Sequence, residues 1–313
     1  MLSILAVTAP IYLIMLGGYA AVRGGLFAAA DMRVMGRLVI YFCLPALLFR
    51  TLAQQPLADI LNGAYIAAYA AGSLVTLGAF TWLARAVLRR PLPLAAMFGL
   101  GAASSNSGFV GYPIAMQLLG PPAGVALALT MLVENLLVIP LALVIADSRK
   151  GTARKVLQDS ARSLVRNPLV LAIVAGFAFA LLGWELPDPV ARTLQIVATG
   201  ATPLALFVVG GSLVGLELSG QRQDIVTVAV GKLLLHPLAV FGFLALLPPL
   251  DADLRTAAVL IAAMPMLSIY PVLAQRYGHE RFCAAVLLAT TTTSFVTITG
   301  LLWAMRTFLG WQL

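Results

Sequence analysis

Charged residues are scarce in this chain. Only 10% of its 313 residues are Asp, Glu, Lys or Arg, whereas 61% are hydrophobic, and the mean hydropathy is +0.98. Soluble domains carry about a quarter charged residues, which cover their surface. So little charge cannot cover a water-exposed globule, and we therefore expect lipid to surround most of the chain.

Cysteine and the signatures of common enzymes are also lacking. The two cysteines, Cys43 and Cys283, lie in or beside apolar runs and indicate neither a disulfide framework nor a metal site. The sequence contains no Walker motif, dinucleotide fingerprint, zinc-ligand spacing or nucleophile–base pair. We therefore predict no cofactor, no metal and no enzymatic activity. The net charge of +8 does not indicate a nucleic-acid partner, because the basic residues lie in short loops between apolar runs.

What is present is a series of ten apolar runs, each near the length that crosses about 30 Å of hydrocarbon. They cover residues 4–22, 36–54, 64–86, 94–119, 123–146, 168–184, 190–216, 224–247, 255–277 and 283–308. Fifteen of the 20 Lys and Arg residues fall in one alternating set of loops, and four fall on the other side. The positive-inside rule then predicts a multi-pass protein of the inner (plasma) membrane with both termini outside.

The sequence also repeats itself. Tyr112-Pro113 recurs as Tyr270-Pro271 after 158 positions, and other proline-marked places recur at the same offset, which maps the first five runs onto the last five. Because five is odd, the two copies would lie in opposite orientations across the bilayer. We predict an all-α integral membrane protein with ten transmembrane helices in a 5+5 inverted repeat. The repeats would be residues 1–146 and 168–313, joined by a cytoplasmic linker at 147–167.

The linker SRKGTARKVLQDSARSLVR is basic and partly amphipathic. This pattern favours a helix lying along anionic lipid, with a regulatory docking site as the alternative.

Spans four and nine contain residues that interrupt helices. Proline removes a backbone donor and clashes with the preceding turn, and glycine tolerates irregular dihedrals. We expect a break around residues 108–113 and an equivalent one in span nine, with the two broken helices crossing near mid-membrane. Helix N-termini at the crossing would attract an anion such as a carboxylate. A kink used only for packing is the alternative. The predicted substrate site comprises Asn106, Ser107, Gly108, Gly111, Tyr112, Pro113, Pro265, Ser268, Tyr270 and Pro271.

Several polar residues fall inside other spans. Glu134 could load and release a proton during the cycle, or stabilise the crossing by hydrogen bonds. Lys232 and His236 share a helix face; Lys232 could extend to the cytoplasmic surface, pair with Glu134 or attract an anion. Arg50, near a span end, fits an interfacial position. The predicted coupling or ion site comprises Glu134, Asn135, Lys232, His236 and Thr292, where Thr292 aligns with Glu134 through the repeat and could instead bond its own helix.

Several motifs in order resemble the auxin efflux carrier family of membrane transporters. They are Leu44-Pro-Ala-Leu-Leu-Phe49, Asn106-Ser-Gly-Phe-Val-Gly-Tyr-Pro113, Asn167-Pro168, Thr202-Pro-Leu-Ala-Leu-Phe207 with Gly210-Gly-Ser-Leu213, and Ala263-Met-Pro265 with Ala274-Gln-Arg-Tyr-Gly278. The resemblance covers nearly the whole chain. It departs in span nine, where many relatives carry an amide shortly after the first proline and this chain has Ser268 and Tyr270 as polar members.

The resemblance implies the fold of the sodium–bile acid symporters. Spans one, two, six and seven would form a scaffold that dimerises, and spans three to five and eight to ten a mobile transport part. Scaffold residues Pro45, Thr202 and Pro203 could close the site. The implied function is secondary transport of a small organic anion, such as malate or malonate, by an elevator-type movement, with a proton as a candidate coupling ion. A sodium-coupled symporter of the same fold and a membrane ligand sensor are the alternatives.

Overall fold

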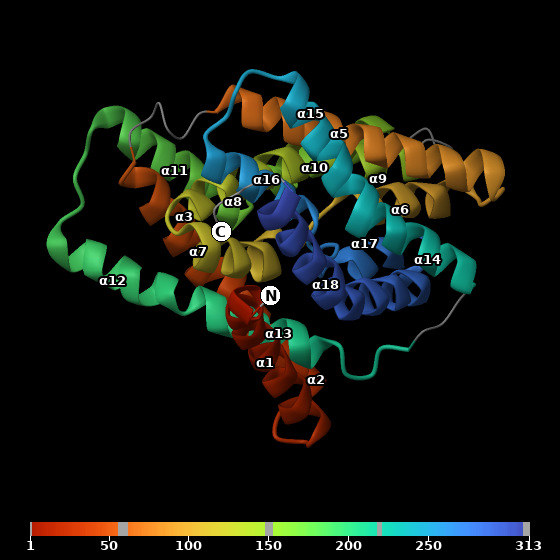
Figure 1. Ribbon diagram of the computed structural model, residues 1–313, viewed down its shortest axis with the longest axis horizontal. Coiled ribbons are helices and arrows are strands. Elements are labelled where there is room, and N and C mark those ends of the chain that lie inside the picture. Colours follow the sequence, from red (N-terminus) through yellow and green to blue (C-terminus); the bar gives the residue numbers. More distant parts are fainter. Residues whose placement is uncertain (1, 56–61, 148–152, 218–220, 309–313) are drawn as a thin grey trace.

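The computed structural model describes residues 2–55, 62–147, 153–217 and 221–308. Within these ranges all regular structure is helical (Figure 1). Six helices there are long and apolar enough to cross a membrane, and Pro168–Leu182 is a shorter apolar helix. The six cover Ala29–Ala53, Gly63–Val87, Pro122–Asp147, Asp188–Ser212, Arg222–Leu246 and Glu280–Thr307.

The helices of the first half lie where the apolar runs predicted spans one to five. They are α1 (Leu2–Arg23); α2 (Ala29–Leu38), the π-helical turn η1 (Val39–Cys43) and α3 (Leu44–Ala53); α5 (Gly63–Trp82) and η2 (Leu83–Val87); α6 (Leu92–Ala103), η3 (Ser107–Gly111) and α7 (Tyr112–Leu119); and α8 (Pro122–Val133), η4 (Glu134–Val138) and α9 (Ile139–Asp147). The predicted linker contains α10 (Ala153–Val165), while residues 148–152 lie outside the described ranges.

The second half has helices at the positions predicted for spans six to ten. They are α11 (Pro168–Leu182); α12 (Asp188–Thr199) and α13 (Ala201–Ser212); α14 (Arg222–Val230), η6 (Gly231–Leu235) and α15 (His236–Leu246); α16 (Ala252–Ala262) and α17 (Tyr270–Gln275); and α18 (Glu280–Phe308). In Figure 1, α5 and α15 run side by side at the top, and α1, α2 and α13 gather at the bottom.

Prolines explain four of the π-helical turns. The turns η1, η3, η4 and η6 are each followed by an α-helix whose second residue is proline: Pro45, Pro113, Pro140 and Pro237. In an α-helix the proline ring would clash with the carbonyl four residues earlier. A π-turn includes one more residue in the hydrogen-bonded ring and so moves this carbonyl away. Such turns are frequent at functional sites, and here they carry Ser107, Glu134 and Lys232.

Glycines allow two pairs of helices to pack backbone to backbone. α1 packs along α13, and a Cβ at Gly18 would overlap the carbonyl oxygen of Phe207. α11 packs along α3, and a Cβ at Gly176 would lie 3.1 Å from the carbonyl oxygen of Phe49. The two contacts are related by the sequence offset, because Gly18 maps onto Gly176 and Phe49 onto Phe207.

The buried apolar residues form two clusters. One joins α1, α3, α7, α11 and α13, with members such as Ile11, Leu48 and Leu206. The other joins α5, α6, α14, α16 and α18, with members such as Tyr69, Phe98 and Val286. α8 contributes to both clusters, because Leu127 and Leu129 point to opposite sides of this helix. The interrupted helices therefore lie where the two clusters meet.

Candidate functional site

The first interruption lies between α6 and η3. α6 ends at Ala103, Ser104 is extended (φ −108°, ψ 147°), and the π-helical turn starts at Ser107. The break thus occupies residues 104–106 rather than the predicted 108–113. The prediction placed it at the glycines and Pro113, but the π-turn accommodates that proline. Short polar side chains compete for backbone groups and end the helix earlier, as the Ser104 hydroxyl does by donating to the Leu100 carbonyl at 2.6 Å.

The second interruption lies between α16 and α17, over residues 263–269, and it contacts the first. The backbone N–H of Asn106 donates to the carbonyl of Pro265 at 2.7 Å. The side-chain amide of Asn106 donates to the Ser268 hydroxyl, also at 2.7 Å. Asn106 is 5% exposed, so these hydrogen bonds lie inside the protein. Two polar residues of the predicted substrate site are therefore joined.

Glu134 accepts hydrogen bonds at the first interruption. Its Oε1 accepts the backbone N–H of Ser105 at 2.7 Å and the Tyr69 hydroxyl at 3.4 Å. Its Oε2 accepts the Ser107 hydroxyl at 3.2 Å. The residue is 4% exposed, and three donors directed at one carboxyl group compensate the water it has lost. Glu134 therefore helps to hold the irregular segment in place.

Lys232 is completely buried, which excludes the predicted extension to the cytoplasmic surface. Its Nζ lies 2.7 Å from the Ser105 hydroxyl, 2.8 Å from the carbonyl of Ala262 and 2.7 Å from Nδ1 of His236. An ammonium has three donors, and these three acceptors satisfy them. Nε2 of His236 lies 2.9 Å from the Ser73 hydroxyl, so this histidine links Lys232 to α5.

Ser105 lies between the two buried charges. Its hydroxyl accepts from Lys232, while its backbone N–H donates to Glu134. The two charged side chains do not form an ion pair within 4.0 Å; the ion pairs found in the described ranges are Arg90–Asp224 and Arg276–Asp147. We call Ser105, Glu134, Lys232 and His236 the buried polar cluster.

The glycines and prolines of the predicted substrate site allow close packing. A Cβ at Gly108 would lie 2.9 Å from the Met131 side chain, and one at Gly111 would lie 3.3 Å from Met264. Pro271 lies in the first turn of α17, where the missing N–H needs no partner, and Pro113 follows the π-helical turn η3 that accommodates its ring. These residues shape the two interruptions rather than offer polar contacts.

Other predicted residues are not brought to the buried polar cluster. The Tyr270 hydroxyl donates to the carbonyl of Met97 at 2.8 Å and anchors α17 to α6. Thr292 is exposed, and its hydroxyl donates to Leu288 within its own helix. The side-chain amide of Asn135 donates to the Met131 carbonyl, and its oxygen accepts from Asn167 at 3.4 Å.

Two cavities with polar lining lie at opposite ends of the helix Ala29–Ala53. The α2 cavity, of about 650 Å³, is lined by residues that include Arg33, Arg37, Phe109, Ser212 and Ser268. The α3 cavity, of about 780 Å³, is lined by residues that include Arg50, Gln54, Tyr112, Gln195, Thr202 and Pro203. Predicted residues Ser268, Tyr112, Thr202 and Pro203 thus line cavities next to the interrupted helices, whereas Pro45 is not among the lining residues of either.

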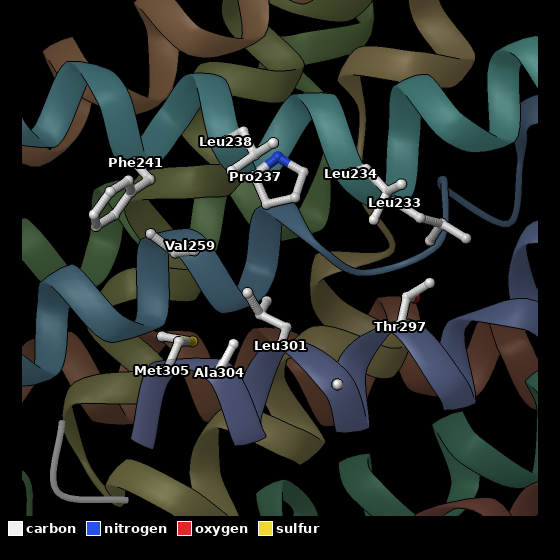
Figure 2. A pocket seen from close by; sticks show the side chains of 11 residues that line it. Leu233, Leu234, Pro237, Leu238, Phe241, Val259, Thr297, Leu301, Ala304 and Met305 are labelled. Carbon is white, nitrogen blue, oxygen red and sulfur yellow. The ribbon is translucent and has the colours of Figure 1, made fainter. Parts of the chain in front are cut away.

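A third cavity lacks the groups that an anion requires. Figure 2 shows side chains of η6 and α15 facing those of α18 across a space of about 460 Å³. Thr297 provides the hydroxyl of this lining, and its side chain donates to the Ser294 carbonyl within α18. The remaining lining residues are apolar, so a carboxylate here would lose its hydration without compensation.

Comparison with known proteins identifies the kind of protein that contains this site. A family model described as "Membrane transport protein" matches residues 3–302. The chain belongs to this family. The membership confirms the resemblance drawn from the motifs and makes the chain an integral membrane transporter.

Relatives match the transporter along most of its length. A protein of Rhizobium meliloti named "Putative malonate transporter" is 29% identical over 311 residues, which cover 98% of this chain and 97% of the relative. The "Uncharacterized transporter YfdV" of Escherichia coli K12 is 24% identical over 299 residues, 94% of each chain. An "Uncharacterized transporter" of Methanothermobacter thermautotrophicus is 27% identical over 269 residues, 84% of this chain and 85% of the relative.

Sequence reasoning missed Arg50 of the transporter. Its position near a span end indicated an interfacial side chain, but Arg50 lines the α3 cavity. A signal was present, because Thr51, Gln54 and Gln55 follow it and also line the cavity. Polar residues within a span usually face the protein interior or a water-filled cavity, so this group indicated a polar cavity beside the helix end.

Proposed function

We propose that the transporter carries a small organic anion, a carboxylate, by alternating access around the two interrupted helices. The observation that carries this proposal is the contact of Asn106 with Pro265 and Ser268, 2.7 Å in each case. Non-helical backbone in a membrane protein requires protein or water partners, and two such segments meeting each other are typical of a transport site. The name of the malonate relative, 29% identical, supports a carboxylate as substrate.

The cavities support access from two sides. The α2 cavity reaches Ser268 and holds Arg33 and Arg37, and the α3 cavity reaches Tyr112, which follows the first interruption. Both lie between the α2–α3 helix and the interrupted segments. In an elevator-type movement, the interrupted helices would pass the substrate from one cavity to the other. Asn106 and Ser268 would then exchange part of their mutual hydrogen bonding for the substrate carboxylate.

The proposed architecture is the 5+5 inverted repeat, with residues 1–146 and 168–313 as the two copies. The contacts Gly18–Phe207 and Gly176–Phe49 support it, because the offset exchanges one for the other. The two apolar clusters support the division into a scaffold, built from α1 to α3 and α11 to α13, and a mobile transport part. We further propose that the scaffold forms a homodimer in the inner membrane, with both termini outside.

We propose that transport is coupled to protons rather than to sodium. In carriers with inverted repeats, the C-terminal ends of half-helices and unwound segments hold the coupling cation. Here Nζ of Lys232 contacts the carbonyl of Ala262, the last residue of α16, and the hydroxyl of Ser105 in the first interruption. A tethered ammonium thus occupies the position that a sodium ion would take. Proton exchange at Lys232 or Glu134 would replace sodium binding.

A thermal-shift screen of the purified protein tests this function. Malonate, malate and monocarboxylates would be added at two pH values, with and without sodium. A ligand at a hundred times its Kd stabilises the folded state by about 2.7 kcal/mol. We expect stabilisation by at least one carboxylate and no added effect of sodium. Absence of stabilisation by every carboxylate would reject the substrate class, and a requirement for sodium would reject the coupling.

A further inference from the structure

The α3 cavity has one charged group in its described lining. This cavity of about 780 Å³ lies among α3, α7, α8, α12 and the start of α13, and Arg50 is its charged lining residue. The other polar lining residues, such as Gln54, Gln195, Thr51 and Thr202, are neutral. A positive charge in a recess that offers neutral hydrogen-bonding groups favours a single bound anion.

Arg50 lacks the partners that an arginine in the protein would need. Its Nε is buried and has no hydrogen-bond partner among the residues that the structure describes. The carboxylates that form ion pairs in these ranges, Asp147 and Asp224, are held by Arg276 and Arg90. Buried polar groups of native proteins are normally satisfied, and charged ones most of all. Arg50 therefore brings a guanidinium with an unsatisfied donor, Nε, to the lining of the cavity.

An interfacial role does not account for this position. Arginines at the ends of spans direct the guanidinium toward the headgroups and leave its donors in water. Arg50 is instead partly buried against the same space as Tyr112, which is 7% exposed and belongs to the helix after the first interruption. Arg50 of α3 and Tyr112 of α7 thus line one cavity.

We propose that Arg50 is the specificity-determining anion receptor of the α3 cavity and binds a carboxylate of the substrate through its guanidinium. The planar guanidinium can bind both oxygens of a carboxylate in two parallel hydrogen bonds. Tyr112, Thr202 and the glutamine amides offer neutral contacts for the remainder of the molecule. This inference rests on the proposed transport of a carboxylate. It adds the residue that selects anions before they reach Asn106.

Direct binding of radiolabelled malonate to the purified full-length protein tests the inference. Arg50→Gln is expected to raise the Kd for malonate at least tenfold. Arg50→Lys keeps the charge but loses the planar guanidinium, so its Kd should lie between those of the wild type and Arg50→Gln. Arg192→Gln is the matched control, since Arg192 is exposed on α12 and is not among the cavity lining residues. It should bind like the wild type.

The outcomes separate this inference from the proposed function. Wild-type protein that binds no carboxylate would reject the function itself. If Arg50→Gln bound malonate as tightly as the wild type, only the role of Arg50 would be overturned. The same holds if Arg192→Gln lost as much affinity as Arg50→Gln. If Arg50→Gln does not fold, Thr202→Trp tests whether malonate binds in the α3 cavity, because the tryptophan fills the cavity and leaves the charge of Arg50 in place. That variant should also lose malonate binding, and unchanged binding would overturn the inference.

Discussion

Nζ of Lys232 and the hydroxyl of Ser105 are 2.7 Å apart, although 127 residues separate them in the chain. This hydrogen bond connects a buried cation to the first helix interruption. The backbone N–H of Ser105 donates to Glu134, so one serine links both buried charges. The charges compensate each other through this residue without direct contact.

Removing only one of these charges should therefore destabilise the protein. Breaking a buried charge pair costs about 3–5 kcal/mol, because the remaining charge stays buried without compensation. Because Ser105 lies between the two charges, we expect Lys232→Met to lower the free energy of unfolding by at most about this amount. The double variant Lys232→Met, Glu134→Gln should recover part of the loss. Unfolding of the wild type, both single variants and the double variant in detergent measures these values, and a loss in the double variant equal to the sum of the two single losses would show that the charges do not interact.

Glu134→Gln should separate substrate binding from coupling. Glutamine keeps the shape and can still accept the N–H of Ser105, but it cannot exchange a proton. We expect malonate to bind as in the wild type, while uptake into vesicles no longer responds to an imposed pH gradient. Uptake by this variant that still follows the pH gradient would assign Glu134 a structural role only.

Asn106→Ala should weaken substrate binding with little loss of folded protein. A hydrogen bond to a charged group contributes about 1.5–3 kcal/mol, so we expect the Kd to rise roughly 10- to 100-fold. Asn62→Ala provides a contrast, because Asn62 caps α5 by accepting the N–H of Tyr65 at 3.0 Å. Loss of such a cap costs about 1 kcal/mol of stability and should leave binding unchanged. Calorimetric titration with malonate compares the two, and unaltered affinity of Asn106→Ala would reject its role.

Two adjacent glycines of α1 should respond differently to alanine. A Cβ at Gly18 would overlap the carbonyl of Phe207, whereas no atom lies within 4 Å of a Cβ at Gly17. Overpacking typically costs about 1–3 kcal/mol, so Gly18→Ala should lower the unfolding temperature and Gly17→Ala should not. Thermal unfolding followed by circular dichroism checks this pair. Gly176→Ala, the repeat-related substitution, should behave like Gly18→Ala. A normal unfolding temperature for Gly18→Ala would argue against close packing of α1 and α13.

The sequence predicted the positions of the helices well, because apolar runs and prolines report burial in lipid and backbone breaks directly. It could not locate the first interruption, since the π-turn before Pro113 is a response of the helix to its surroundings. The sequence also could not predict which face of each helix is turned toward the protein interior. The repeat aligned Thr292 with Glu134, yet Thr292 is exposed and Glu134 is buried.

The long side chains show the same limit. Lys232 and Arg50 are both basic residues within predicted spans, and the composition of these spans does not distinguish their environments. Packing decides that Lys232 turns inward to Ser105 and Ala262, while Arg50 faces a cavity. Their distinct environments depend on residues 30 or more positions away, such as Ala262 for Lys232 and Tyr112 for Arg50, which a local pattern does not reveal.

Uptake of radiolabelled malonate into proteoliposomes with imposed ion gradients tests the central claim most directly. We expect accumulation above that of protein-free liposomes when a pH gradient is imposed, and equal accumulation with or without a sodium gradient. Malonate uptake that needs a sodium gradient, or no uptake of malonate or other carboxylates under any gradient, would contradict it.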